Sequence, residues 1–145
     1  MICVENRQRR VRLDLHWLRR LANHAFERCG GPEIDPKGLL TKLAEIDVAI
    51  VSDRRMAKVH REFMGIPGPT DVITFHHGEI VISADTAQGF ASEYGQTVDR
   101  EVARYLIHGL LHLAGYDDHT TKERARMHRL QERVLRACLL READR

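Results

Sequence analysis

The chain lacks most of the features that mark membrane, secreted or zinc-ribbon proteins. Its 145 residues contain no apolar run of about 18 residues, the length that a membrane helix needs. The first 17 residues, MICVENRQRRVRLDLHW, lack the apolar run of a signal peptide. The three cysteines are far apart and never in CxxC spacing, so neither a disulfide framework nor a zinc ribbon is indicated. We therefore expect a cytoplasmic protein with reduced thiols and no membrane contact.

Lysine is also scarce, since the 23 Lys and Arg residues comprise 19 arginines and only 4 lysines. Arginine suits bidentate contact with phosphate. The net charge is only +2, however, and this neither requires nor excludes nucleic acid as a partner. Internal repeats and low-complexity segments are absent. The length fits one domain with its own core, so we expect residues 1–145 to form a single domain.

The pattern of apolar residues predicts strands and helices along the whole chain. β-branched residues favour strands, and the last two predicted strands flank a short turn at residues 76–78, which indicates a hairpin. Asp14, Ser52 and Thr97 stand where helix N-caps belong, and Gly115 stands just after a helix end. The expected strands are 2–5, 44–52, 70–75 and 79–83. One expected helix follows Asp14 and ends at Gly30-Gly31, a second follows Ser52 and ends near Gly65, and the others are 84–94, 97–114 and 120–140.

The segment LIHGLLHLAGYDDHT, residues 106–120, carries a candidate metal site. His108 and His112 are four residues apart on a predicted helix, so their imidazoles project from one face. Histidine pairs of this spacing are commonly plain surface or core residues, but here Gly115 turns the chain back and Asp-Asp-His follows. Either Asp118 or His119 would then complete a three-ligand zinc site with a fourth position open to water, whose pKa a metal would lower.

The spacing of this segment parallels the metzincin protease motif H-E-x-x-H-x-x-G-x-x-H. Gly109 stands where that motif has its glutamate, which is the general base of peptide hydrolysis. A zinc peptidase is therefore disfavoured, and the pattern favours a metal hydrolase of another kind.

Three segments, HGLLHLAGYDD, GPTDVITF and GEIVIS, resemble the signatures of one family, the YbeY endoribonucleases. HGLLHLAGYDD is similar to the family signature H-G-x-L-H-L-x-G-Y-D-H. GPTDVITF, residues 68–75, is similar to P-T-D-V-L-S-F, and GEIVIS, residues 78–83, resembles G-D-I-x-I-S. The three blocks occur in the family's order, and the resemblance covers roughly residues 40–135.

The resemblance implies both a fold and a function. The fold would be α+β, a small mixed sheet of about four strands packed against helices, with the metal site at the C-terminal end of a central helix. The function would be that of a zinc-dependent single-strand endoribonuclease with one zinc ion per chain. Such an enzyme would act in maturation of small-subunit (16S) ribosomal RNA, including its 3′ end, and in ribosome quality control. Its partners would be ribosomal RNA, the small subunit and associated proteins.

The third metal ligand departs from the family pattern. The family has a histidine ten residues after its first ligand, and the tenth residue after His108 is Asp118. His119 would take this role only if the loop carried an insertion. The segment ERARM, residues 123–127, matches the family without a gap, so we favour Asp118 and keep His119 as the alternative. An anionic aspartate would leave the metal a weaker Lewis acid than a third histidine would.

A second departure concerns the loop before Thr70. The family has an arginine here that is thought to serve the RNA chemistry, and this chain has Met64. Arg61, one helical turn earlier, is a substitute candidate for the catalytic role. His60 stands where the family has an asparagine in the helix that precedes this loop. Met64 in place of the arginine favours the alternative of a non-catalytic, zinc-stabilised, ribosome-associated factor that binds RNA or a ribosomal protein.

Other residues have a structural and a functional interpretation that the sequence leaves open. His76 and His77 fit either a turn or contact with substrate, and Asp71 fits a bond to backbone at a strand start. Tyr116 and Asp117 fit either the turn or the orientation of metal ligands. Trp17 fits the core or its rim better than a platform for base stacking. Two groups of arginines fit either solvated faces or an RNA-binding surface: Arg7, Arg9, Arg10 and Arg12, and Arg124, Arg126, Arg129 and Arg133.

Overall fold

The computed structural model describes residues 1–144, and these form a mixed sheet and helices in the α+β arrangement that the resemblance implied. The strand and helix predictions are confirmed, with shifts at the ends of elements. In chain order the elements are β1 (Ile2–Asn6), α1 (Leu15–Cys29), β2 (Ile46–Val51), α2 (Asp53–Met64), β3 (Val72–Phe75), β4 (Glu79–Ser83), α3 (Ala84–Glu93), α4 (Val98–Leu113) and α5 (Thr121–Ala143).

The sheet has the strand order β1-β2-β4-β3. β2 pairs in parallel with both β1 and β4, while β3 pairs antiparallel with β4 and forms one edge of the sheet. The predicted hairpin is therefore confirmed. Its turn requires glycine, because Gly78 has a φ of +113° and a Cβ there would lie 2.8 Å from the carbonyl oxygen of Glu45.

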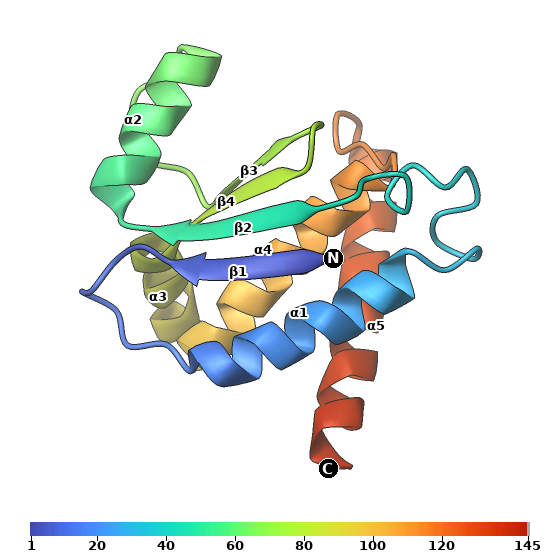
Figure 1. The fold of residues 1–145 in the computed structure, drawn as a ribbon. Helices are drawn as coiled ribbons and strands as arrows, with labels where there is room; N and C mark the ends of the chain where they lie inside the picture. Colours follow the sequence, from blue (N-terminus) through green and yellow to red (C-terminus); the bar gives the residue numbers. More distant parts are fainter. Residues whose placement is uncertain (145) are drawn as a thin grey trace.

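The main core lies between one face of the sheet and α1, α3, α4 and α5 (Figure 1). Isoleucines of β2 and β4, among them Ile50, Ile80 and Ile82, point into it and are fully buried. α4 runs through the middle of this layer, and its Leu106 and Leu110 are fully buried as well. Because α4 is surrounded on most sides, its sequence is apolar over more than one stripe.

The opposite face of the sheet is covered mainly by α2. A smaller core of Ala49, Val51, Ile73 and Val81 packs there against Met56, the one residue of α2 that is buried. The rest of α2 rises away from the sheet (Figure 1). The helix ends at Gly65, whose φ of +67° is the left-handed conformation that glycine favours.

The predicted helix caps are confirmed. The side chains of Asp14, Ser52 and Thr97 accept hydrogen bonds from the backbone N–H groups three residues later. Thr120 starts α5 with a capping box shared with Glu123. Among the helices of residues 1–144, none combines the length and the apolar character that crossing a membrane requires.

Candidate metal centre

The C-terminal end of α4 is shaped by a Schellman motif. The N–H of Gly115 donates to the carbonyl of His112, and the N–H of Tyr116 donates to that of Leu111, both at 3.0 Å. Gly115 has a φ of +104°, and a Cβ there would lie 2.9 Å from Leu39. This turn reverses the chain, so residues 117–119 return over the last turn of the helix.

The turn brings Asp118 to the two histidines of α4. The Nε2 atoms of His108 and His112 lie 3.1 Å apart, and Asp118 Oδ2 lies 3.5 Å from the first and 3.4 Å from the second. In a tetrahedral zinc site with bonds of about 2.0–2.1 Å, ligand atoms lie about 3.3 Å from one another. The three donor atoms therefore have the spacing of a zinc site with two histidines and a carboxylate, and they form one of the potential metal-binding groups of the described chain.

The alternative ligand His119 lies elsewhere. Its side chain is exposed, and it is not part of the group formed by His108, His112 and Asp118. Its backbone carbonyl accepts a hydrogen bond from Arg124, as does the carbonyl of Asp118. Arg124 thus holds the loop in the arrangement that turns the Asp118 side chain inward. Which of the two residues binds a metal stays a prediction.

The hydrogen bonds of the imidazoles show which ring nitrogens carry protons. His112 Nδ1 lies 2.9 Å from the carbonyl oxygen of Tyr116, and His108 Nδ1 lies 2.9 Å from Gln131 Oε1. Both partners are oxygens that only accept, so each Nδ1 must be the donor. Each neutral ring then presents a lone pair at Nε2. When both rings are neutral, two lone pairs and a carboxylate oxygen converge at this spacing, an arrangement that a cation would stabilise.

The orientation of Gln131 is itself fixed by neighbouring charges. Its Nε2 donates to Glu132 Oε2 at 3.1 Å, so its oxygen must face His108. The Glu132 carboxylate accepts two hydrogen bonds from Arg104, at 2.8 and 3.0 Å, and Arg104 also donates to Glu101. We call Gln131, Glu132, Arg104 and Glu101 the support network. Sequence analysis missed Gln131, because nothing in the pattern of α5 shows which residue faces a histidine on α4.

Burial, together with the neighbouring His108, lowers the pKa of His112, although Asp118 opposes this shift. His112 is therefore neutral around pH 7, and neutral imidazole is the form that binds metal ions.

A cavity of about 530 Å³ opens over the donor atoms. It brings together several of the residues singled out in the sequence, including Met64, His76 and Asp117. His77 is not among them, because its ring stacks on Phe75 and its Nε2 lies 3.9 Å from Glu79. The lining residues are Met64, Thr70, Asp71, Val72, Ile73, Thr74, His76, His108, His112, Asp117, Asp118 and His119.

Two of the residues before β3 have clear structural partners. Asp71 Oδ1 accepts the N–H of Val72 at 2.7 Å, the bond to backbone that was predicted at this strand start. His60 Nδ1 donates to the carbonyl of Gly68 at 2.9 Å, so it ties the loop after α2 back to the helix. Arg61, the candidate catalytic arginine, is exposed and is not among the residues that line the cavity.

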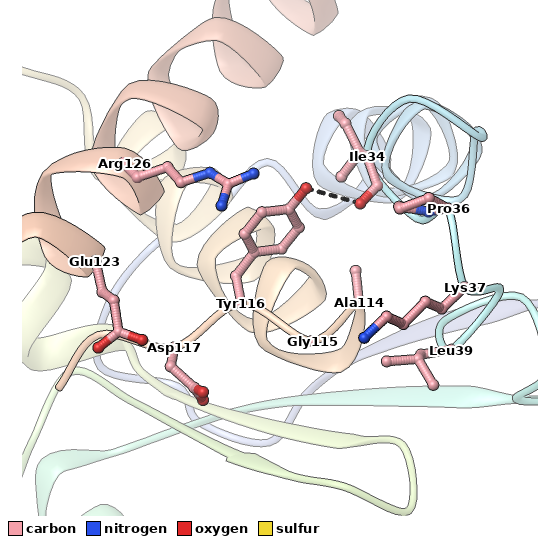
Figure 2. A pocket seen from close by; sticks show the side chains of 10 residues that line it. All are labelled: Ile34, Pro36, Lys37, Leu39, Ala114, Gly115, Tyr116, Asp117, Glu123 and Arg126. Carbon is pink, nitrogen blue, oxygen red and sulfur yellow. Dashed lines mark hydrogen bonds between the residues drawn. The ribbon is translucent and has the colours of Figure 1, made fainter.

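A second hollow, of about 260 Å³, lies behind the loop that carries Asp118 (Figure 2). There the Tyr116 hydroxyl donates to the carbonyl of Ile34 at 2.8 Å, and the Arg126 guanidinium lies 5.3 Å from the centre of the Tyr116 ring. Tyr116 therefore anchors the loop through its side chain and orients His112 through its backbone carbonyl.

The position that a metzincin protease gives to glutamate has no space for a side chain. A Cβ on Gly109 would lie 2.8–3.0 Å from three side-chain atoms of Ile80, which is fully buried in β4. Helix α4 thus packs tightly against β4 at the residue where a peptidase needs its general base.

Comparisons with known proteins agree with the three sequence blocks. The family model described as Endoribonuclease YbeY matches residues 3–138. A protein named Endoribonuclease YbeY from Heliobacterium modesticaldum is 32% identical over 140 residues, covering 82% of this chain and 80% of that protein. Its namesake from Pelotomaculum thermopropionicum is 36% identical over 107 residues, covering 63% and 70%. A solution structure from Thermotoga maritima shares the fold, with a TM-score of 0.67, 24% identity and coverage of 99% of this chain and 93% of that one.

Proposed function

Because the chain belongs to the YbeY family of endoribonucleases, we propose that it is a zinc-dependent enzyme that cleaves single-stranded RNA. Its substrate would be small-subunit (16S) ribosomal RNA, matured at sites that include the 3′ end, and it would take part in ribosome quality control. The observation that carries this proposal is the convergence of two imidazole lone pairs and one carboxylate oxygen at 3.1–3.5 Å.

One zinc ion per chain would be held by His108, His112 and Asp118. A zinc ion in such a site supplies a Lewis acid for a phosphoryl oxygen and acidifies a water molecule. Gln131 and the carbonyl of Tyr116 keep the two imidazoles in the Nδ1–H form, so that each Nε2 is free to bind. Arg61, close in sequence to the Met64 wall of the cavity, would offset negative charge on the RNA backbone.

In this proposal residues 1–145 act as one catalytic domain in the cytoplasm, where ribosomes assemble. The partners would be the small ribosomal subunit and its associated proteins, with ribosomal RNA as the substrate. The family name supports the RNA substrate, and the resemblance of the three sequence blocks supports the ribosomal role.

The direct test measures bound zinc and RNA cleavage in the same four proteins: wild type, His112→Ala, Asp118→Ala and His119→Ala. We expect near-stoichiometric zinc in the wild type and in His119→Ala, and loss of zinc and of cleavage in the other two. Loss of zinc in His119→Ala with retention in Asp118→Ala would reverse the ligand assignment. A wild type that holds no zinc after reconstitution would contradict the proposed mechanism.

A second candidate function is a non-catalytic factor that binds RNA on the ribosome. The observation that favours it is Met64 in the cavity wall, at the position where the resemblance places an arginine. A thioether offers no positive charge to a phosphate. Binding of single-stranded ribosomal RNA by the zinc-loaded protein without any cleavage would identify this alternative. A zinc peptidase is disfavoured by the packing of Gly109, and a casein digestion assay tests it.

A further inference from the structure

The exposed end of α2 carries an apolar surface beside the cavity. The side chains of Phe63, Met64 and Ile66 are 66%, 54% and 48% exposed. Every residue from 61 to 69 is exposed, so no other part of the described chain covers this segment. Contiguous exposed apolar side chains of this size commonly mark a binding site.

This surface is ordered by contacts beneath and behind it. The Phe63 ring packs edge-on against Phe75 with centroids 5.3 Å apart, and Phe75 stacks on His77 at 5.7 Å and 27°. The hydrogen bond from His60 to Gly68 holds the following loop against the helix. The rings are therefore arranged before any partner binds, which lowers the entropy lost on binding. We call Phe63, Met64, Ile66, Phe75 and His77 the aromatic platform.

A row of cations without anionic partners runs along the same helix. Arg54, Lys58 and Arg61 are spaced by four and three residues, so they share one face of α2 over about 10 Å. Within residues 1–144, none of the three forms an ion pair or a side-chain hydrogen bond, and the same holds for Arg55. A row of unpaired cations is complementary to a polyanion.

Several other arginines differ from this row in having partners, although Arg9, Arg12, Arg129 and Arg133 form no ion pair or side-chain hydrogen bond within residues 1–144 either. Arg7 pairs with Glu5, Arg10 with Asp85 and Arg141 with Glu27. Two members of the arginine group at the start of the chain therefore have acidic partners, and in the second group Arg124 is bonded to the loop carbonyls. The free cations of α2 were not among the arginines that the sequence suggested for an RNA-binding surface.

The aromatic platform is continuous with the candidate metal centre. Met64 belongs to the platform and also lines the 530 Å³ cavity that contains His108, His112 and Asp118. A single-stranded RNA bound in the cavity would therefore contact the aromatic platform at one end. Single-stranded nucleic acids are commonly bound in this way, with bases stacked on aromatic rings and phosphates near cations.

We propose that the aromatic platform stacks bases of single-stranded RNA next to the cleaved bond, while Arg54, Lys58 and Arg61, on the side of α2 turned away from Phe63, contact phosphates farther along the RNA. This inference rests on the proposed function and adds the surface that guides the strand. Because every base offers a π-face, the platform would bind single strands with little sequence preference and would exclude duplexes, whose bases are already stacked. A protein partner would use the apolar residues but would leave the row of cations unexplained.

The test uses the full-length, zinc-loaded protein and a fluorescent 2′-O-methyl oligouridylate of twelve nucleotides, with binding followed by anisotropy. Phe63→Ala should weaken binding about tenfold, the effect of losing one base–aromatic stack. Phe63→Trp should bind at least as well as wild type, and Phe63→Leu, which keeps the bulk but not the π-system, should be weaker. Leu140→Ala, a change at a 62% exposed residue of α5, is the matched control and should bind like wild type.

An abasic strand of the same length separates base stacking from other contacts. It should bind wild type more weakly than the oligouridylate does, and Phe63→Ala should cause no further loss. The double variant Arg54→Gln/Lys58→Gln should lower the slope of log K against log salt by about 1.4, because two phosphate contacts to a single strand are removed.

Two results would overturn the inference: unchanged binding in Phe63→Ala, or an equal loss of affinity for the normal and the abasic strand. Unchanged binding would point to a protein partner on this surface instead. Cleavage of unmodified RNA is measured separately, so the two proposals fail independently. If RNA binding depends on Phe63 but no RNA is cleaved, the proposed enzyme activity is contradicted and the aromatic platform is supported. If RNA is cleaved and neither binding nor cleavage depends on Phe63, the aromatic platform is contradicted and the enzyme activity is supported.

Discussion

Gln131 on α5 accepts a hydrogen bond from His108 on α4 across a separation of 23 residues. Gln131 is 8% exposed, and its amide nitrogen is directed at Glu132, which is paired with Arg104. The support network therefore determines which nitrogen of His108 carries the proton. Partners of this kind orient metal-binding histidines and raise their basicity.

Replacing Gln131 by methionine should lower the affinity for zinc about 10- to 100-fold, because His108 loses the acceptor that fixes its tautomer and its ring orientation. The side chains are similar in volume, so the fold should be preserved. Zinc affinity is measured by competition with a chromogenic chelator. Gln88→Met, on the exposed side of α3, is the control and should bind zinc like wild type. Equal affinity in both variants would show that His108 does not depend on Gln131.

Glu132→Gln should lower the free energy of unfolding by about 1–2 kcal/mol at pH 7, because the Arg104 guanidinium loses its bidentate partner. The difference should depend on pH. Burial would raise the pKa of Glu132, but hydrogen bonds from Arg104 and Gln131 outweigh it and hold the pKa below its ordinary value of 4.5.

A carboxyl group whose pKa is lowered by folding stabilises the protein above its unfolded pKa, and this contribution is lost as the pH falls through the folded pKa. The unfolding curves of wild type and Glu132→Gln should therefore differ above about pH 5 and converge as the pH is lowered from there. Urea denaturation at a series of pH values checks this. A constant difference down to pH 3 would contradict the assignment.

Gly109→Ala should destabilise the protein by about 1–3 kcal/mol, because the added methyl group would press on three atoms of the buried Ile80. Gly89→Ala on α3 is the matched control, since a Cβ there meets nothing within 4 Å. That variant should be stabilised by about 0.5–1 kcal/mol, the usual gain of alanine over glycine in a helix. Thermal and chemical denaturation measure both changes. A neutral Gly109→Ala would mean that α4 can move away from β4.

The three cysteines are free thiols, as predicted, but they should differ in reactivity. Burial raises the pKa of Cys29 to about 12, with a smaller contribution from nearby Cys138, and burial also raises that of Cys138 to about 11. Since the thiolate is the reactive form, Cys3 should be alkylated first at pH 8. Mass spectrometry after brief treatment with iodoacetamide should show one modified residue in the native protein and three after denaturation. Rapid modification of Cys29 in the native state would contradict its burial.

The sequence predicted most elements of the fold because their signals are local. Asp14, Ser52 and Thr97 cap helices because their side chains accept the backbone N–H groups three residues later. Gly115 turns the chain where the left-handed conformation is needed. Predicted strand 70–75 was too long, since β3 begins at Val72. The backbone carbonyl of Asp71 still accepts the N–H of Ser83 at 2.9 Å, so the pairing with β4 ends at this residue.

For the candidate metal site, too, some features follow from local sequence signals and others from tertiary packing. The sequence by itself determined that His108 and His112 share a helix face, and that a carboxylate or a histidine returns to them after Gly115, since both follow from helical period and turn chemistry. Only the tertiary structure decided that Asp118 rather than His119 lies within 3.5 Å of both rings, that Gln131 holds His108, and that Ile80 fills the space beside Gly109. These contacts join elements far apart in the chain, and their geometry depends on how α4, α5 and β4 pack, which no local pattern specifies.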